Sequence, residues 1–341
     1  MVQAVSSPGA SSPLPSGRAA EPWLVFAGSG GGAHGTRCHA AIAVGVAPQR
    51  VLLLDTAGGF EVVAGLKRAE IDLLAVTRIF LSHRHSDHLL GLEPLLLHIG
   101  LDAMWSRRRA GEVRIFGESR VLAAAQAILD AVASSAPQLI ADAGGQVVWV
   151  PVAAERTVAA WPDVALTPFA ADHVPDDGTN LGCTVDLDGA LFGPGVRETP
   201  YRLAYSADTR PAAALVCAAA GADVLIHEAG GLDAHQEQVS RAGHSTAGEA
   251  GRQATAAGAG RLFLFHVPND GLVPELLREA RGAFSGPVEV AEDGQAHSLL
   301  QPAQPAVPRA RDAAAPVVRT GRRRTPVRAS EASPPSPSPA G

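Results

Sequence analysis

Short apolar runs alternate with segments of helical periodicity along the middle of this chain. Apolar runs bounded by glycine, proline and polar residues are typical of buried strands, and apolar positions three or four apart are typical of amphipathic helices. The runs predict strands at residues 23–27, 51–55, 78–82, 113–116, 147–150, 164–169, 184–187, 203–205, 224–227 and 262–265. The periodic segments predict helices at residues 62–70, 88–100, 119–134, 211–221, 246–258 and 274–282.

The alternation of strands and helices predicts an α/β fold. No repeat of fixed period is visible, and two strand-rich halves follow one another along the chain. Two such halves suit two sheets packed face to face with helices on the outer faces. We therefore expect one four-layered αββα sandwich over residues 23–301.

The two ends of the chain differ in composition from its middle. Residues 1–22 are rich in Ser, Pro, Gly and Ala, and residues 302–341 combine Pro, Ala and Ser with seven arginines. Neither end holds enough large apolar side chains to offset the entropy of ordering, so we expect two disordered tails.

Charge is distributed unevenly between the expected domain and the second tail. The whole chain carries a net charge of −6, and the tail at 302–341 carries +5, which leaves −11 on residues 23–301. A basic tail on an acidic body could touch nucleic acid electrostatically. The simpler interpretation is a tail that aids solubility or is removed by proteolysis.

The sequence also bears on the compartment. It contains no run of about 18 apolar residues that would span a membrane. Its start lacks the basic residues and apolar stretch of a secretory signal. The three cysteines, Cys38, Cys183 and Cys217, are odd in number and far apart, so a disulfide framework is not expected. We predict a cytoplasmic protein in a reducing setting.

The densest group of reactive side chains is the motif His-x-His-x-Asp-His at residues 83–88, between a predicted strand and a predicted helix. His83 and His85 are two residues apart, so both point the same way in an extended turn. Asp87 and His88 follow as the chain enters the helix. Imidazole nitrogens and carboxylates suit zinc, with manganese or iron as alternatives. This motif predicts a metal site.

Two metals would need more ligands than this motif supplies. Three polar residues farther along the chain each follow or end a predicted strand: His173, Asp208 and His266. Their order along the chain and their placement at strand ends, taken together with the first motif, favour a ligand role, so we expect them to complete the site.

At this point the chain resembles the metallo-β-lactamase superfamily and, within it, ribonuclease Z and its phosphodiesterase relatives. The resemblance covers residues 23–290 and rests on the motif at 83–88, on Tyr-Ser-Ala-Asp-Thr at 205–209, on Leu-Ile-His-Glu-Ala at 225–229 and on Gly-His-Ser-Thr-Ala at 243–247. The last two motifs are the more specific, because many superfamily members lack them. The resemblance implies the metallo-β-lactamase fold.

The same resemblance implies two zinc ions per chain, one held by three histidines, the other by an aspartate and two histidines, with a second aspartate bridging them. These ligands are, in that order, His83, His85 and His173; Asp87, His88 and His266; and Asp208. It also implies a metal-activated hydroxide as the nucleophile. Asp87 would orient that nucleophile, His244 would protonate the leaving oxygen, and Glu228 would orient His244. Ser245 is a plausible N-cap for the following helix.

A glycine loop offers a rival interpretation. The segment from Gly28 to Ala33, with Asp55 at the end of the next predicted strand, imitates a dinucleotide-binding fingerprint. The fingerprint requires a helix directly after the loop, and residues 36–40 do not open one. A glycine turn after the first strand also suits the superfamily, so we set nicotinamide binding aside. His34 and His39 lie near this loop and stay outside the expected ligand set.

The expected substrate depends on whether the chain has the inserted arm of ribonuclease Z. Ribonuclease Z uses an inserted basic arm to grip transfer RNA, but His173 and Asp208 are only 35 residues apart here, and residues 193–197 are at most a vestige of it. An acidic body is also a poor match to a polyanion. We expect a binuclear zinc hydrolase of RNA or a small phosphodiester.

Two alternatives remain at this point: a hydrolase of carboxylic, thio- or sulfate esters, and a non-catalytic member that recruits a partner. The resemblance also implies a possible homodimer.

Overall fold

The computed structural model describes residues 21–132, 135–174 and 178–300. Except for Glu21 and Pro22, the two segments predicted as disordered tails lie outside the described residues. The domain bounds of 23 and 301 therefore stay a prediction.

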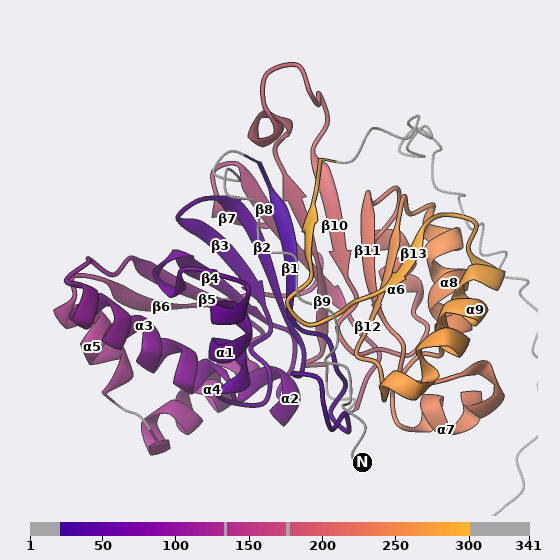
Figure 1. Cartoon of the computed structure of the whole chain (residues 1–341), viewed down its shortest axis with the longest axis horizontal. Coiled ribbons are helices and arrows are strands. Elements are labelled where there is room, and N and C mark those ends of the chain that lie inside the picture. Colours follow the sequence, from indigo (N-terminus) through magenta and orange to yellow (C-terminus); the bar gives the residue numbers. More distant parts are fainter. Residues whose placement is uncertain (1–20, 133–134, 175–177, 301–341) are drawn as a thin grey trace, which may run out of the picture. The chain divides into compact units, whose positions relative to one another are not determined.

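Two sheets form the centre of the described part (Figure 1). The first has the strand order β14-β1-β2-β3-β4-β5-β6, and the second has the order β13-β12-β11-β10-β9-β8-β7. The strands of the first sheet are β1 (Trp23–Gly28), β2 (Ala41–Ala47), β3 (Arg50–Leu54), β4 (Val76–Leu81), β5 (Glu112–Gly117), β6 (Gln146–Pro151) and β14 (Ala296–Ser298). Those of the second are β7 (Val158–Trp161), β8 (Val164–Ala170), β9 (Leu181–Leu187), β10 (Tyr201–Tyr205), β11 (Val224–Glu228), β12 (Leu262–Phe265) and β13 (Val288–Val290).

Helices cover the outer faces of both sheets, with α1, α3, α4 and α5 on the first sheet and α6, α8 and α9 on the second (Figure 1). The helices are α1 (Glu61–Arg68), α2 (Ser86–Leu89), α3 (Leu92–Ser106), α4 (Ser119–Val132), α5 (Ala136–Asp142), α6 (Ala213–Ala218), α7 (Gln236–Arg241), α8 (Ala247–Ala257) and α9 (Val273–Ala283). None of the helices in this described part is long and apolar enough to cross a membrane.

Alternation along the strands divides the apolar side chains among three layers. On β1, Val25 packs into the cluster beneath the helices of the first sheet, while Leu24 and Phe26 pack into the cluster between the sheets. Successive strand residues point to opposite faces, so a strand buried on both faces feeds two cores. A third core lies between the second sheet and its helices. The predicted αββα sandwich is confirmed.

The directions of the strands bring several loops to one edge of each sheet. Strands β3 to β6 run parallel in the first sheet, and β10 to β13 run parallel in the second. Parallel strands present their carboxyl ends at the same edge of a sheet, which is where α/β proteins place their sites. The segments that follow β3, β4, β10 and β12 carry the polar residues considered below.

The ten predicted strands are all present, but several short elements escaped prediction: β2, β7, β13, β14, α5 and α7. Strand β2 alternates Ile42, Val44 and Val46 with Ala and Gly, so it has few large apolar side chains, and β13 and β14 have only three residues each. The single helix predicted at 88–100 was wrong, because α2 ends at Leu89 and α3 begins at Leu92. Between them Gly91 packs so closely on the backbone that its Cβ would lie 1.6 Å from the carbonyl oxygen of Thr56.

Candidate metal centre

The loops at the carboxyl edges of the two sheets bring distant polar residues together. His83 and His85 follow β4, and α2 supplies two more side chains. The second sheet contributes one residue each from the segments after β8, β10 and β12. All seven predicted ligands converge in two clusters, namely His83, His85, His173 and Asp208, and Asp87, His88, Asp208 and His266. Within each cluster the potential ligand atoms lie within 4.8 Å of one another.

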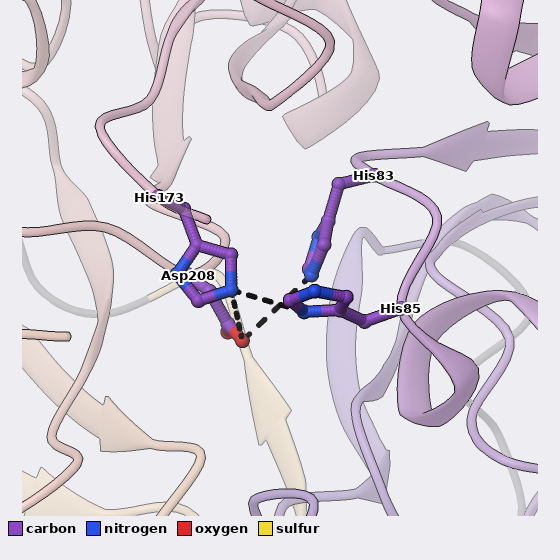
Figure 2. Close-up of side chains that lie close together, drawn as sticks. All are labelled: His83, His85, His173 and Asp208. Carbon is purple, nitrogen blue, oxygen red and sulfur yellow. Dashed lines mark hydrogen bonds and ion pairs between the residues drawn. The ribbon is translucent and has the colours of Figure 1, made fainter. Parts of the chain in front are cut away.

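Figure 2 shows the four side chains of the first cluster pointing toward a common centre. Nε2 of His173 lies 3.7 Å from Oδ2 of Asp208, and Nε2 of His83 lies 3.9 Å from the same oxygen. Nδ1 of His85 is 3.1 Å from Nε2 of His173. The three imidazoles and the carboxylate thus enclose a space on the scale of one metal ion.

The second cluster uses the same oxygen of Asp208. This oxygen lies 3.3 Å from Nε2 of His88 and 3.3 Å from Nε2 of His266. Oδ2 of Asp87 is 3.2 Å from Nε2 of His266 and 3.6 Å from Nε2 of His88. Asp208 therefore stands between the two clusters, where a carboxylate could bridge two cations.

Unpaired polar atoms show that the clusters suit a cation. Nε2 of His83 and Oδ1 of Asp208 are buried and make no hydrogen bond. Buried polar groups normally have partners, because burying an unpaired one is costly. Neutral imidazole nitrogens and carboxylate oxygens are the donors that zinc, manganese and iron accept. The residues present fit divalent metal ions.

For most of these side chains, the surroundings favour the protonation state that metal binding requires. Burial lowers the pKa of His83, His85 and His173, which keeps each imidazole neutral and able to bind metal. Burial alone would raise the pKa of Asp208, but nearby His266 and His88 hold it well below its usual value. The carboxylate at the centre is therefore ionised.

His88 behaves differently because it faces two carboxylates. Burial opposes its protonated form, but the charges of Asp208 and Asp55 raise the pKa of His88 well above its ordinary value. Nε2 of His88 lies 3.3 Å from Oδ2 of Asp208. A metal ligand role for His88 requires it to lose the proton on Nε2.

Asp55 was missed as a site residue in the sequence and is fully buried. It accepts a hydrogen bond of 2.7 Å from Nδ1 of His88 and one of 2.6 Å from the hydroxyl of Ser82. The Ser82 hydroxyl in turn lies 2.9 Å from Nδ1 of His83. These contacts leave Nε2 of both histidines turned toward the clusters, as supporting residues do in metal sites. The sequence offered one clue to this role of Asp55: it directly follows β3, which is parallel to β4, so it lies at the same edge of the sheet as the motif at 83–88.

His244 and Glu228 form a pair beside both clusters. Nδ1 of His244 lies 3.0 Å from Oε1 of Glu228, and the His244 ring centroid lies 4.9 Å from that of His173 and 5.2 Å from that of His266. Burial opposes the protonated form, but Glu228 raises the pKa of His244 to about 9. The side chain is 21% exposed, so a protonated imidazole beside the clusters remains open to solvent.

The segment after His244 corrects one prediction. The N-cap of α8 is Thr246, which forms a capping box with Glu249, so the suggested N-cap at Ser245 is wrong. The hydroxyl of Ser245 instead donates a hydrogen bond of 2.7 Å to the carbonyl oxygen of Thr209.

The glycine loop forms part of the wall of the centre. A Cβ at Gly32 would lie 2.8 Å from Oδ2 of Asp87, and one at Gly31 would lie 3.0 Å from Nδ1 of His266. The next element is strand β2, so the helix required by a dinucleotide fingerprint does not follow. His39 pairs with Glu61, and neither it nor His34 belongs to the clusters.

Similarity to known proteins identifies the family of this chain. Residues 50–267 match the family described as the β-lactamase superfamily domain, and the chain belongs to this family. Ribonuclease Z of Myxococcus xanthus (strain DK1622) is 46% identical over 115 residues, which cover 33% of this chain and 36% of that protein. The match thus spans little more than a third of that relative.

Two further similarities extend over more of the chain. Ribonuclease Z of Salinibacter ruber (strain DSM 13855 / M31) is 30% identical over 294 residues, covering 73% of this chain and 86% of that protein. The crystal structure of the metallo-β-lactamase fold protein YhfI from Bacillus subtilis aligns with a TM-score of 0.63 and 22% identity, over 81% of this chain and 99% of that one. The resemblance inferred from the motifs is confirmed, as is the fold.

Proposed function

We propose that this protein is a metal-dependent hydrolase that cleaves phosphodiesters and uses two divalent ions. The observation that carries the proposal is the pair of clusters sharing Asp208, with the His244–Glu228 pair beside them. The similarity to proteins named ribonuclease Z supports the phosphodiester as the substrate class.

The nitrogen and oxygen donors favour zinc, with manganese or iron as substitutes. His83, His85 and His173 would hold one ion, and Asp87, His88 and His266 would hold the other, with Asp208 shared. Two bound ions would act as Lewis acids that lower the pKa of water and offset charge on the phosphate.

The chain's own groups have separate tasks in this proposal. Burial would raise the pKa of Asp87, but His266 and His88 lower it well below its usual value, so its carboxylate is ionised and suited to orienting the attacking water. His244 carries a proton on the open side of the clusters and would donate it to the leaving oxygen. Glu228 fixes the ring of His244 through Nδ1, which leaves Nε2 for that transfer.

The connection between β9 and β10 favours a small phosphodiester over a folded RNA gripped by an arm. It contains the short helix η3 (Gly189–Phe192) and one basic side chain, Arg197. The guanidinium of Arg197 binds both carboxylate oxygens of Asp223, at 2.7 and 2.8 Å, and lies over the ring of Tyr201. Arg197 is thus engaged within the domain. It precedes β10, whereas Asp208 follows that strand.

The test is hydrolysis of bis(p-nitrophenyl) phosphate by protein loaded with zinc or manganese. We expect turnover that chelator abolishes and that Asp87→Ala lowers by at least about 100-fold, as for the loss of a group acting on the transition state. Asp142→Ala, at the end of α5, is the matched control and should keep wild-type turnover. No turnover with either metal would contradict the proposal.

The substrate itself is decided by a panel. It compares small phosphodiesters with precursor transfer RNA, each with the full chain and with a chain lacking residues 302–341, and adds carboxylic, thio- and sulfate esters. Preferential cleavage of one of those esters would move the proposal to an ester hydrolase. The homodimer and the cytoplasmic setting stay predictions, which solution mass and cell fractionation would test.

A further inference from the structure

Thr209, the residue directly after Asp208, is fully buried and uses all of its polar groups. Its N–H donates a hydrogen bond of 2.8 Å to Oε1 of Glu228. Its carbonyl oxygen accepts one of 2.7 Å from the hydroxyl of Ser245. Its own hydroxyl oxygen accepts one of 3.0 Å from the N–H of Asp172. One residue therefore binds three segments that are distant in the chain.

Each of these segments carries a residue of the centre. Asp172 immediately precedes His173, a member of the first cluster. Ser245 immediately follows His244. Oε1 of Glu228 accepts from both Thr209 and His244, so one carboxylate oxygen joins the two.

The hydroxyl of Thr209 has a fixed orientation. It donates to the carbonyl oxygen of Arg210 at 2.7 Å while it accepts from Asp172. The N–H of Arg210 donates back to the carbonyl oxygen of Asp172 at 2.7 Å. The strand ends that carry Asp208 and His173 are therefore tied together by three hydrogen bonds, the third from the Arg210 guanidinium to the Asp172 carboxylate at 2.9 Å.

The turn that holds Asp208 needs such support. Ala207 has φ 52°, a left-handed conformation that costs a residue with a Cβ free energy. Strained backbone of this kind persists where surrounding contacts hold it in place. Ala207 precedes Asp208, and the contacts on the other side of Asp208 along the chain come from Thr209.

We propose that Thr209 is a positioning residue, whose hydroxyl and peptide group hold the shared ligand Asp208 in register with His173 and His244. The inference rests on the proposed function, since it assigns a task within that metal centre. Thr209 itself is buried behind the ligands and would touch neither substrate nor metal. Loss of its hydroxyl should loosen the ligands and slow the reaction, with little effect on substrate binding.

The test compares two substitutions in the full chain. Thr209→Val removes the hydroxyl and keeps the shape, whereas Thr209→Ser keeps the hydroxyl. Zinc affinity is measured by competition with a chromophoric chelator, and kcat and KM are measured separately on bis(p-nitrophenyl) phosphate. We expect Thr209→Val to bind at least one zinc ion about 10–100-fold more weakly, as for the loss of other supporting residues in metal sites, and to lower kcat at unchanged KM. Thr209→Ser should restore both.

Thr184→Val is the matched control, because Thr184 is a buried threonine on β9 of the same sheet and takes no part in the clusters. It should bind zinc as the wild type does. If thermal unfolding shows that Thr209→Val does not fold, Ser245→Ala removes the donor to the Thr209 carbonyl and should also weaken zinc binding.

Wild-type zinc affinity and kcat in the folded Thr209→Val variant would overturn the inference, as would equal losses in Thr209→Ser. A wild-type protein that binds zinc but cleaves no phosphodiester would overturn only the proposed substrate class. In that case the zinc competition still decides the role of Thr209.

Discussion

The carboxylate of Asp55 accepts hydrogen bonds from His88, from the hydroxyl of Tyr205, and from both the N–H and the hydroxyl of Ser82. Ser82 and His88 belong to the first half of the chain, and Tyr205 ends β10 of the second sheet. One buried residue therefore orients histidines of the two clusters and also connects the two sheets. At this scale, the proposed chemistry depends on which ring nitrogen of a histidine is hydrogen-bonded, because the other nitrogen then faces the clusters.

His244 allows a prediction at the same scale. A poor leaving group needs a proton in the transition state, whereas p-nitrophenolate leaves readily without one. His244→Ala should therefore lower kcat by about 10²–10⁴-fold on a dinucleotide. Its effect on bis(p-nitrophenyl) phosphate should be much smaller. Steady-state kinetics on both substrates make the comparison, and equal losses on the two would argue against a proton-donating role.

At the scale of elements, the break between α2 and α3 lies directly after the motif at 83–88. Leu90 and Gly91 separate the two helices, and the N–H of Thr56 donates to the carbonyl oxygen of His88 at 2.8 Å. The loop after β3 thus lies directly on the end of α2. Only a residue without a Cβ fits at Gly91, because the Thr56 carbonyl occupies that space.

Gly91→Ala should therefore destabilise the fold. Forcing a Cβ into this contact moves backbone, and overpacking of this kind costs about 1–3 kcal/mol or more in the free energy of unfolding. Gly59→Ala is the matched control, because a Cβ there meets nothing within 4 Å. Chemical denaturation measures both variants. Equal free energies of unfolding for the two variants would show that the backbone at the α2–α3 junction can shift to accept a Cβ.

At the scale of the whole described domain, the metal centre lies where the two sheets meet. The motif at 83–88 comes from the first sheet, while His173, Asp208 and His266 come from the second. The apolar layer between the sheets aligns their edges, since it includes Phe80 of β4 and Phe265 of β12, close to the ligands in the chain. Metal binding should therefore depend on the packing of the complete sandwich.

Zinc should accordingly stabilise the folded protein. A ligand that binds only the folded state adds about 2.7 kcal/mol at a free concentration of 100 times its Kd. We expect Tm to rise with zinc and to fall in chelator, as measured by scanning calorimetry. Asp208→Ala should show a much smaller zinc-dependent shift, because it removes the ligand common to both clusters. A Tm that does not respond to zinc would contradict assembly of the site from both sheets.

The sequence predicted the long strands and the local metal motif, but it missed features that depend on packing. Strand β2 has few large apolar residues, and its place between β1 and β3 comes from pairing with them. Ser245 had the side chain of an N-cap, yet its hydroxyl found Thr209, which is distant in sequence. Asp55 was assigned to a rival motif because its partners, Ser82, His88 and Tyr205, are distant in sequence.

The sequence by itself determined the residue types of the candidate centre, because four potential ligands within six residues need only one turn to meet. It also determined the αββα class, since strand and helix periods are local properties of the chain. Only the tertiary structure decided that Asp55 engages the far side of His88 and that Thr209 joins three segments. Those contacts are hydrogen bonds and ion pairs between distant segments, so they exist only once the sheets have packed.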